Sequence, residues 1–296
     1  MNVLAFGEIL WDIIEGNHHL GGAPFNFAAH TAQCGNTAFI VSRLGKDKLG
    51  EEAFEMCGKV KVNHSLIQWD EQHPTGIVDV TLKDGQPDYV IQENVAYDYI
   101  EYNKSLQLLR EDYFDVFYYG SLAQRGPVSA STLLKLLTNH YFREVFYDVN
   151  LRKKGYSDAI IKKSLVYCSI LKLNIDEVPV LAQILFGKPA AGEEDFCKRL
   201  HDLYHNINTV VITAADKGCM IYSKGRLTHV PGVPVKVADA VGAGDAFSAA
   251  FMHTYIQHGD AIRAAQVANQ MGAYVASQHG PIPAYTEELK KVIAGD

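Results

Sequence analysis

The strongest constraint on the fold is an alternation of short apolar runs with longer amphipathic stretches. Apolar runs suited to buried parallel strands occur at 3–8, 37–45, 116–121, 145–150, 170–174 and 209–213. Helical patterns lie between most of them, at 25–34, 48–60, 104–112, 129–139, 158–168, 176–186, 193–205, 243–258 and 260–278. This order predicts an α/β chain whose parallel sheet is built from right-handed βαβ units.

The segment 74–99 breaks this order. It shows two alternating strand patterns joined at 83–86 by a hairpin-type connection, with no helix between them. Together with residues 11–20 it is predicted to form a small sheet over one edge of the domain. In many enzymes such a flap excludes water from the reacting centre, but a surface hairpin without function fits the pattern equally well.

Composition limits the partners and the compartment. A chain of 296 residues with a net charge of -7 predicts one large domain and argues against nucleic-acid or membrane partners, which need a basic surface. The five cysteines are scattered and form no metal-binding or disulfide pattern. No basic leader and no apolar run of roughly 18 to 20 residues is found, so the expected compartment is the cytoplasm.

The segment DAVGAGD at 239–245 places two acids and two glycines before a helical pattern. The glycines permit a tight turn that leaves the amides of Gly242, Ala243 and Gly244 free at the helix start. Asp245 falls in the first turn, where the helix dipole is expected to lower the pKa of its carboxyl. Phosphoryl transfer needs such amide donors and such an acid, although helix capping is the favoured explanation for this segment by itself.

Two further segments have both a chemical and a capping interpretation. In GEILWD and LGGAPFN, Asp12 and Asn26 suit the hydroxyls of a polyol, and Gly22 lets the backbone approach it. In KLNIDEV, Asn174 and Glu177 lie three residues apart at the carboxyl end of a strand, which suits Mg²⁺ on nucleotide phosphates. Taken singly, each of these residues is also an ordinary turn or capping residue.

These segments, in this order, resemble the ribokinase-like (PfkB-type) family of carbohydrate kinases. The resemblance runs from residue 3 to about 289 and includes GGAPFN, GKDKLG at 45–50, DVNLR at 148–152, NIDE at 174–177, TAADKG at 213–218 and DAVGAGDAF. It implies a three-layer αβα fold with a mostly parallel central sheet. It further implies a single domain over 1–296, with segments 11–20 and 74–99 forming a β-sheet lid that pairs two chains into a homodimer in some such folds.

The resemblance also implies roles for individual residues. Asp245 corresponds to the catalytic base, and Gly242, Ala243 and Gly244 correspond to the anion hole for the transferred phosphoryl group. The sugar contacts correspond to Asp12, Gly22 and Asn26, with Gln124, Arg125 and Arg152 near the sugar or the phosphate. The nucleotide contacts correspond to Asn174, Thr213, Gly218 and Asn269, with Glu177 linked to Mg²⁺ and Asp239 to a monovalent cation such as K⁺.

Three positions depart from the family pattern. Ala240 replaces Thr or Ser, which leaves a requirement for K⁺ open. Ala215 replaces a glycine of the nucleotide loop and is expected to reshape it, because a Cβ restricts positive φ. Val149 replaces a frequent proline.

The resemblance predicts an ATP-dependent sugar kinase of the fructokinase type, with D-fructose as the first candidate substrate. A 2-keto-3-deoxygluconate kinase, or another PfkB-type sugar kinase, is the alternative. Its substrate 2-keto-3-deoxygluconate carries a carboxylate, and Arg152 suits an anionic group of this kind. For Gln124 and Arg125 a salt bridge or helix cap is as good an explanation as substrate contact. A binding protein without catalysis is the second class, and a dinucleotide oxidoreductase is disfavoured because the first strand lacks the G-x-G-x-x-G turn.

Overall fold

The main sheet has nine strands. The computed structural model describes residues 1–14, 17–83, 86–109 and 113–295, and orders this sheet β13-β12-β11-β10-β9-β8-β1-β4-β5. Its strands are β1 (Asn2–Phe6), β4 (Thr37–Gly45), β5 (Ile67–Asp70), β8 (Phe114–Gly120), β9 (Phe142–Asp148), β10 (Ile170–Asn174), β11 (Thr209–Thr213), β12 (Cys219–Ser223) and β13 (Arg226–Val230). All neighbours pair in parallel except β11 with β12 and β12 with β13.

The central strands are buried on both faces, which explains why they read as continuous apolar runs. Alternate side chains of β1 enter opposite cores: Val3 and Ala5 pack in one hydrophobic cluster, and Leu4 and Phe6 pack in the other. Because side chains alternate along a strand, an apolar residue at every position requires cover on both sides of the sheet.

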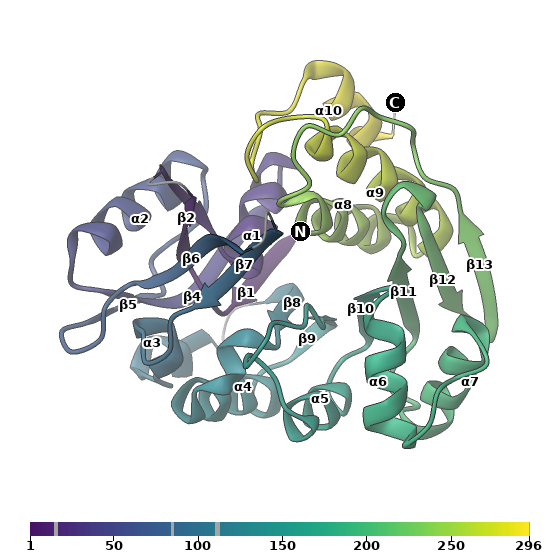
Figure 1. Cartoon of the computed structure of the whole chain (residues 1–296), viewed down its shortest axis with the longest axis horizontal. Helices are drawn as coiled ribbons and strands as arrows, with labels where there is room; N and C mark the ends of the chain where they lie inside the picture. Colours follow the sequence, from purple (N-terminus) through teal and green to yellow (C-terminus); the bar gives the residue numbers. More distant parts are fainter. Residues whose placement is uncertain (15–16, 84–85, 110–112, 296) are drawn as a thin grey trace.

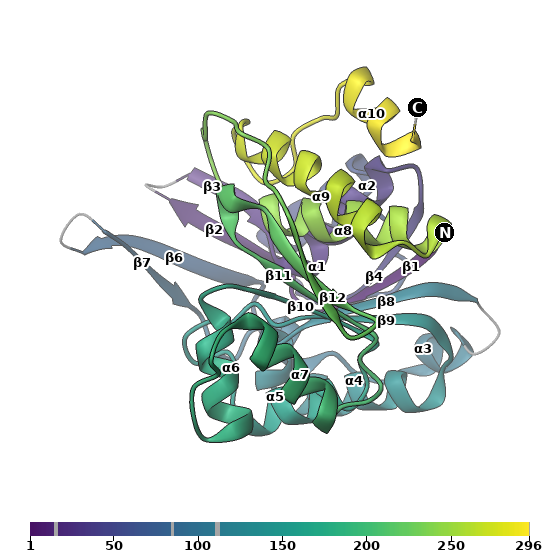
Figure 2. The ribbon, with the colours of Figure 1, turned by 90° about the vertical axis from the view of Figure 1, so that its right-hand side faces the viewer.

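Helices supply that cover in two layers (Figures 1 and 2). One layer contains α1 (Ala23–Gln33), α2 (Lys48–Lys59), α8 (Ala243–His258), α9 (Ala261–Ala276) and α10 (Glu287–Ala294). The opposite layer contains α3 (Lys104–Leu108), α4 (Pro127–Asn139), α5 (Asp158–Leu165), α6 (Glu177–Phe186) and α7 (Glu193–Leu203). The three-layer α/β architecture is therefore confirmed. No helix in the described ranges is long and apolar enough to span a bilayer.

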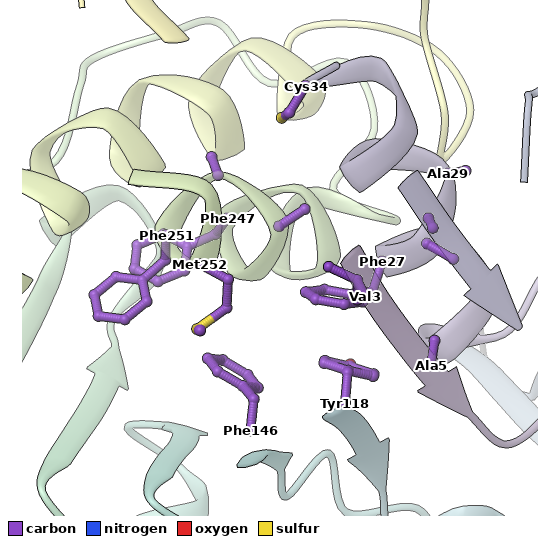
Figure 3. Close-up of a cluster of buried hydrophobic side chains, with 14 of the residues drawn as sticks. Val3, Ala5, Phe27, Ala29, Cys34, Tyr118, Phe146, Phe247, Phe251 and Met252 are labelled. Atoms are coloured by element: carbon purple, nitrogen blue, oxygen red, sulfur yellow. The ribbon is translucent and has the colours of Figure 1, made fainter. Parts of the chain in front are cut away.

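An aromatic stack ties α1 to the middle of the main sheet. Phe27 of α1 stacks on Tyr118 of β8 with ring centroids 3.9 Å apart, and Phe146 of β9 lies beside them (Figure 3). The Tyr118 hydroxyl donates to the Asp148 carboxylate at 3.1 Å. The core is thus bonded directly to the last residue of β9.

The interrupted region forms a second sheet of four strands, called here the small sheet. Its order is β3-β2-β6-β7, from β2 (Leu10–Ile14), β3 (Asn17–Gly21), β6 (Gly76–Lys83) and β7 (Gln86–Ile91). The β2–β6 pair is parallel and the other two pairs are antiparallel. The predicted small sheet from 11–20 and 74–99 is therefore present, although 96–99 forms the 3₁₀ turn η1 (Ala96–Tyr99) and residues 84 and 85 of the predicted connection lie outside the described residues.

The sequence analysis missed four of the strands and α-helices that the structure describes. The strands β5, β12 and β13 and the helix α10 had no predicted counterpart. Since β11, β12 and β13 form an antiparallel meander, the βαβ order ends at β11, which agrees with the prediction of a mostly parallel sheet. The pattern missed β13 because its residues are half exposed, so that it lacks an apolar run.

Candidate active site

Polar side chains gather where the parallel strands end. Asp148, Asn174 and Thr213 are the last residues of β9, β10 and β11. Asn26 and Asp245 lie in the first turns of α1 and α8, and the Asn26 Nδ2 donates to Asp245 Oδ2 at 2.8 Å. The segments 20–35 and 239–245, more than 200 residues apart, therefore meet at one point (Figure 1), as expected for a ligand site at the carboxyl edge of an open α/β sheet.

The turn before Asp245 depends on its first glycine. Gly242 is the N-cap of α8 with φ of 80°, and a Cβ there would overlap the Pro281 carbonyl. Within the described residues the amides of Gly242 and Gly244 have no backbone acceptor, whereas the Ala243 N–H donates to the Ala240 carbonyl at 3.3 Å. The expected free amides are thus found at the two glycines, while the Ala243 amide is already engaged in a long bond.

The pKa of Asp245 moves opposite to the expected direction. Burial raises the pKa of this carboxyl from 3.8 to about 6, and the charge of Asp148 adds to the rise. Lys172, the Asn26 hydrogen bond and Arg152 act against it. The prediction from the helix dipole was therefore wrong in direction, because desolvation outweighs a dipole effect that is small by comparison. A carboxyl that releases its proton near neutral pH is suited to act as a general base.

Asp12 lies in the middle of β2, with its Oδ2 against Gly21. Burial raises its pKa to about 6, while Arg152 and His19 lower it. Gly22 is the N-cap of α1 with φ of 106°, and a Cβ there would press on the backbone carbonyl of Glu8. The small sheet and α1 are thus joined at Gly22, a position that admits no side chain.

The three outer residues predicted near the sugar have different surroundings. Arg152 is exposed in the loop after β9 and lowers the pKa of Glu8, Asp12 and Asp245 through its charge. Gln124 is buried and donates to the Gly120 carbonyl and to Ser164 of α5, both at 2.9 Å. Its amide is therefore satisfied inside the protein, among the helices of the layer opposite α1.

Arg125 belongs to the junction between the main sheet and the small sheet. Its Nε donates to Asp98 Oδ1 at 2.8 Å, and its Nη2 donates to the Tyr97 hydroxyl at 2.9 Å and to the Gln92 carbonyl. The Arg125 and Asp98 side chains are only 10% and 7% exposed. Of the two interpretations left open for Arg125, this geometry matches the salt bridge.

Asn174 and Glu177 form a reciprocal cap at the start of α6. The Glu177 N–H donates to Asn174 Oδ1 at 3.0 Å, and the Asn174 N–H donates to Glu177 Oε2 at 2.8 Å. Glu177 Oε1 accepts from the Leu151 N–H at 2.6 Å. The capping interpretation therefore holds as geometry, and the same bonds fix the Glu177 carboxylate beside the loop that carries Arg152.

The predicted nucleotide segment is a strained loop after β11. Ala215 takes φ of 49°, a left-handed conformation that a Cβ disfavours. The loop was expected to differ in shape because a Cβ restricts positive φ, but Ala215 keeps the positive φ that a glycine would readily adopt. Gly218 has φ of 89° and packs on Val230 and Gly232, and Asn269 of α9 donates to the Val230 and Pro231 carbonyls at 3.2 and 2.9 Å. Asn269 thus holds the strand that backs Gly218.

The two other departures also have structural consequences. The Val149 N–H donates to the Lys172 carbonyl at 2.9 Å, a bond that a proline could not make. Ala240 is exposed, and its carbonyl accepts from Ala243. Asp239 accepts from the Val241 N–H at 3.0 Å and from the Gly280 N–H at 3.2 Å, so it fixes the turn and the loop behind it.

The sequence interpretation assigned no role to three charged residues at this edge. Glu8 is 3% exposed, and burial raises its pKa to about 7. Lys172 Nζ contacts both Asp148 oxygens at 3.0 and 2.9 Å, and a Cβ at Gly244 would lie 3.4 Å from that Nζ. The sequence did contain a signal for two of them, because Asp148 and Lys172 are charged residues inside apolar runs of the sequence. They are direct neighbours in the β9–β10 register.

Comparison with known proteins decides the family. The model of pfkB family carbohydrate kinases matches residues 4–288. The chain belongs to this family. Its relatives include a probable fructokinase of Arabidopsis thaliana, 27% identical over 95% of this chain and 93% of the relative, and a putative sugar kinase of Pyrococcus horikoshii, 29% identical over 84% and 81%. A crystal structure of fructokinase with bound ATP from Xylella fastidiosa shares the fold, with a TM-score of 0.86 at 21% identity over 99% of this chain and 97% of the other.

The pfkB family match makes the protein an ATP-dependent carbohydrate kinase. The carboxyl edge of its main sheet holds amide donors and acids, which are the kinds of group that phosphoryl transfer to a hydroxyl uses. The identities to proteins named fructokinase, near 27%, establish the family and leave the sugar to be argued from the site.

Proposed function

We propose that the kinase transfers the γ-phosphoryl group of ATP to a hydroxyl of a small neutral sugar, D-fructose first, with Asp245 as the base. The observation that carries this proposal is the Asn26–Asp245 contact at the start of α8. Asn26 engages Asp245 Oδ2, which leaves Oδ1 to accept the proton of an attacking hydroxyl. The free amides of Gly242 and Gly244, with the Ala243 amide released from its long bond, offset the charge that develops on the phosphoryl oxygens.

Acceptor groups dominate the proposed sugar side. Glu8, Asp12 and Asp245 each have a raised pKa because of burial, and these carboxyls suit a substrate that donates hydroxyl protons. A sugar carboxylate would meet repulsion from any of them that is ionised. Arg152 is the group that keeps 2-keto-3-deoxygluconate as the alternative substrate. Gln124 and Arg125, whose polar atoms are engaged within the protein, support the sugar side through the loop that follows β8.

The nucleotide is proposed to bind along the ends of β10 and β11. Asn174 and Thr213 mark its phosphate end, and Gly218 and Asn269 mark the loop nearer the base. Mg²⁺, when bound with ATP, would neutralise phosphate charge. No group of three His, Cys, Asp or Glu side chains suited to a metal occurs in the described ranges, and both Glu177 oxygens accept backbone amides. This donor set fits an ion held chiefly by phosphates, with Glu177 reaching it through water.

Other parts of the proposal concern the whole protein. We propose one domain over residues 1–296, the small sheet as a lid over the sugar, a homodimer formed through that lid, and a cytoplasmic location. Asp239, fixed to the Val241 and Gly280 amides, supports a monovalent-cation site built with main-chain carbonyls. Small-molecule sugar and ATP are the proposed partners, without nucleic acid or membrane.

The experiment is an ADP-release screen with fructose, ribose, glucose, mannose, ketodeoxygluconate, adenosine and fructose phosphates. We expect the highest kcat/KM with fructose. Asp245→Asn is expected to abolish turnover while sugar binding and folding persist, and Asp158→Asn, which changes another first-turn acid on α5, is expected to leave turnover unchanged. Sugar binding without ADP release by the native protein would favour a non-catalytic relative, and near-normal turnover by Asp245→Asn would remove the base.

A further inference from the structure

A buried histidine on α1 has both ring nitrogens bonded and no part in the proposed chemistry. The His30 side chain is 0% exposed, and its Nε2 lies 2.9 Å from the Pro281 carbonyl oxygen. Its Nδ1 lies 2.6 Å from the Tyr285 hydroxyl. Because a carbonyl only accepts, Nε2 carries the proton and donates, so Nδ1 must accept from the hydroxyl. Burial lowers the pKa of His30 to about 4, which keeps this neutral form at physiological pH.

The carbonyl that His30 holds is the one against which Gly242 packs. A Cβ on Gly242 would overlap the Pro281 oxygen and its neighbouring atoms, so the two backbones are in direct contact. The preceding residue, Gly280, donates its N–H to Asp239 Oδ2 at 3.2 Å. The 239–245 turn therefore rests at two points on residues 280 and 281.

Helix α1 contacts both ends of this arrangement. Asn26 donates to Asp245 at one end of the turn, and His30, one helical turn later, donates to the Pro281 carbonyl behind it. Residues four apart lie on the same face of a helix. One rigid helix thus sets the position of the acid and the backing of the amides together.

We propose that His30 and Tyr285 are positioning residues that hold the Pro281 carbonyl against Gly242, and so fix the amides of the turn relative to Asp245. The inference rests on the proposed role of those amides. The Tyr285 hydroxyl donates to His30 Nδ1 and so keeps the proton on Nε2. The Nε2 proton is donated to the Pro281 carbonyl, and that carbonyl packs against Gly242 of the turn. Neither side chain is required to touch the sugar or ATP.

The test compares two hydroxyl deletions, one at Tyr285 and one at Tyr274 of α9, whose hydroxyl bonds to the loop that carries Tyr285. Tyr285→Phe removes the donor to His30, and Tyr274→Phe is the matched control because its hydroxyl donates to the Ala284 carbonyl at 2.6 Å and not to His30 or Pro281. We expect Tyr285→Phe to lower kcat about tenfold with little change in the sugar KM, since small misplacements of catalytic groups cost rate. Tyr274→Phe should keep the native kcat.

A double-mutant cycle and hydrogen exchange make the test decisive. In a His30→Ala background, Tyr285→Phe should have no further effect on kcat, because the two act through one carbonyl. Amide exchange of the 239–245 segment should rise in Tyr285→Phe and stay native in Tyr274→Phe, whether or not a sugar substrate has been found. Unchanged exchange and unchanged kcat in Tyr285→Phe would overturn the inference. Lack of ADP release by the native protein would instead count against the proposed function, with exchange still testing the contact.

Discussion

At the scale of single residues, the proton affinity of Asp245 is set by its neighbours. Burial and Asp148 raise its pKa, and Lys172 and Asn26 lower it, with a balance at about 6. A general base works only when ionised, so the fraction of competent enzyme falls as the pH drops through that value.

We therefore predict that kcat/KM is flat above neutrality and falls below pH 6, approaching about tenfold per pH unit. The measurement is a pH series of initial rates with saturating ATP. Enzyme held at pH 5.5 should regain full activity when returned to pH 7.5, which separates titration from unfolding. A profile that stays flat to pH 4.5 would contradict Asp245 as the base.

The Lys172–Asp148 ion pair gives a second prediction. The two side chains are 10% and 1% exposed. Removing one partner of a buried pair leaves an uncompensated charge, so Lys172→Met should lower the free energy of unfolding by about 3 to 5 kcal/mol. Because Lys172 lowers the pKa of Asp245, the acid limb of the rate profile should also move to higher pH.

Urea denaturation measures the first effect, and the pH series measures the second. The double change Lys172→Met with Asp148→Leu is the control, since it removes both charges and should recover most of the lost stability. Native stability in Lys172→Met would mean that Asp148 finds compensation elsewhere.

At the scale of elements, the turn before α8 requires glycine for two separate reasons. Gly242 has positive φ, and any Cβ would overlap Pro281. Gly259, at the other end of the same helix, also has positive φ, at 66°, but nothing lies within 4 Å of its Cβ position. An alanine at Gly259 would therefore add only backbone strain, whereas an alanine at Gly242 would add both backbone strain and steric overlap.

We predict that Gly259→Ala lowers the free energy of unfolding by about 1 kcal/mol, the cost of a Cβ in the left-handed region, and leaves kcat native. Gly242→Ala should cost more stability and reduce kcat by about 100-fold, because the displaced amides no longer match the transition state. Thermal denaturation and initial rates give both quantities. Equal effects of the two substitutions on kcat would argue against a catalytic role for the turn.

At the scale of the whole molecule, the Arg125–Asp98 pair joins the small sheet to the main sheet. Asp98 belongs to η1, which follows β7, and Arg125 belongs to η3 (Leu122–Arg125), which follows β8. Leu10, Val78, Val95, Tyr97 and Leu122 form a separate hydrophobic cluster at the same junction. One buried ion pair and one apolar cluster therefore lie at the junction of the small sheet and the main sheet.

We predict that Arg125→Met lowers the free energy of unfolding by about 3 to 5 kcal/mol, because Asp98 stays buried without its cation. Arg199→Met is the matched control, since the Arg199–Asp195 pair on α7 is more exposed and should be worth less than about 1 kcal/mol. Urea denaturation of both variants measures the difference. If Arg125→Met were as stable as Arg199→Met but raised the sugar KM, direct substrate contact would replace the structural role.

Most of the fold was accessible from the sequence because its signals are local. The strands β4, β10 and β11 and the helix α8 have the predicted bounds, since their apolar runs end at turn residues or caps. The missed strands β12 and β13 are short and pair antiparallel, so neither the parallel-strand pattern nor the spacing of helices pointed to them. At the site, the motifs identified Asp245 and Asn26 as candidates, but the hydrogen bond between them spans a separation that no local pattern reports.

The sequence by itself indicated the family, through the resemblance of its motifs, and the α/β class with most of the strands and helices, because apolar period, turn residues and motif order can be read along the chain. Only the tertiary structure decided the electrostatics of Asp245, the pairing of Lys172 with Asp148, the use of Arg125 at the sheet junction and the contact of His30 with Pro281. These properties depend on burial and on partners brought together from distant segments. Desolvation and hydrogen bonding act over a few ångströms in space, whatever the distance along the chain.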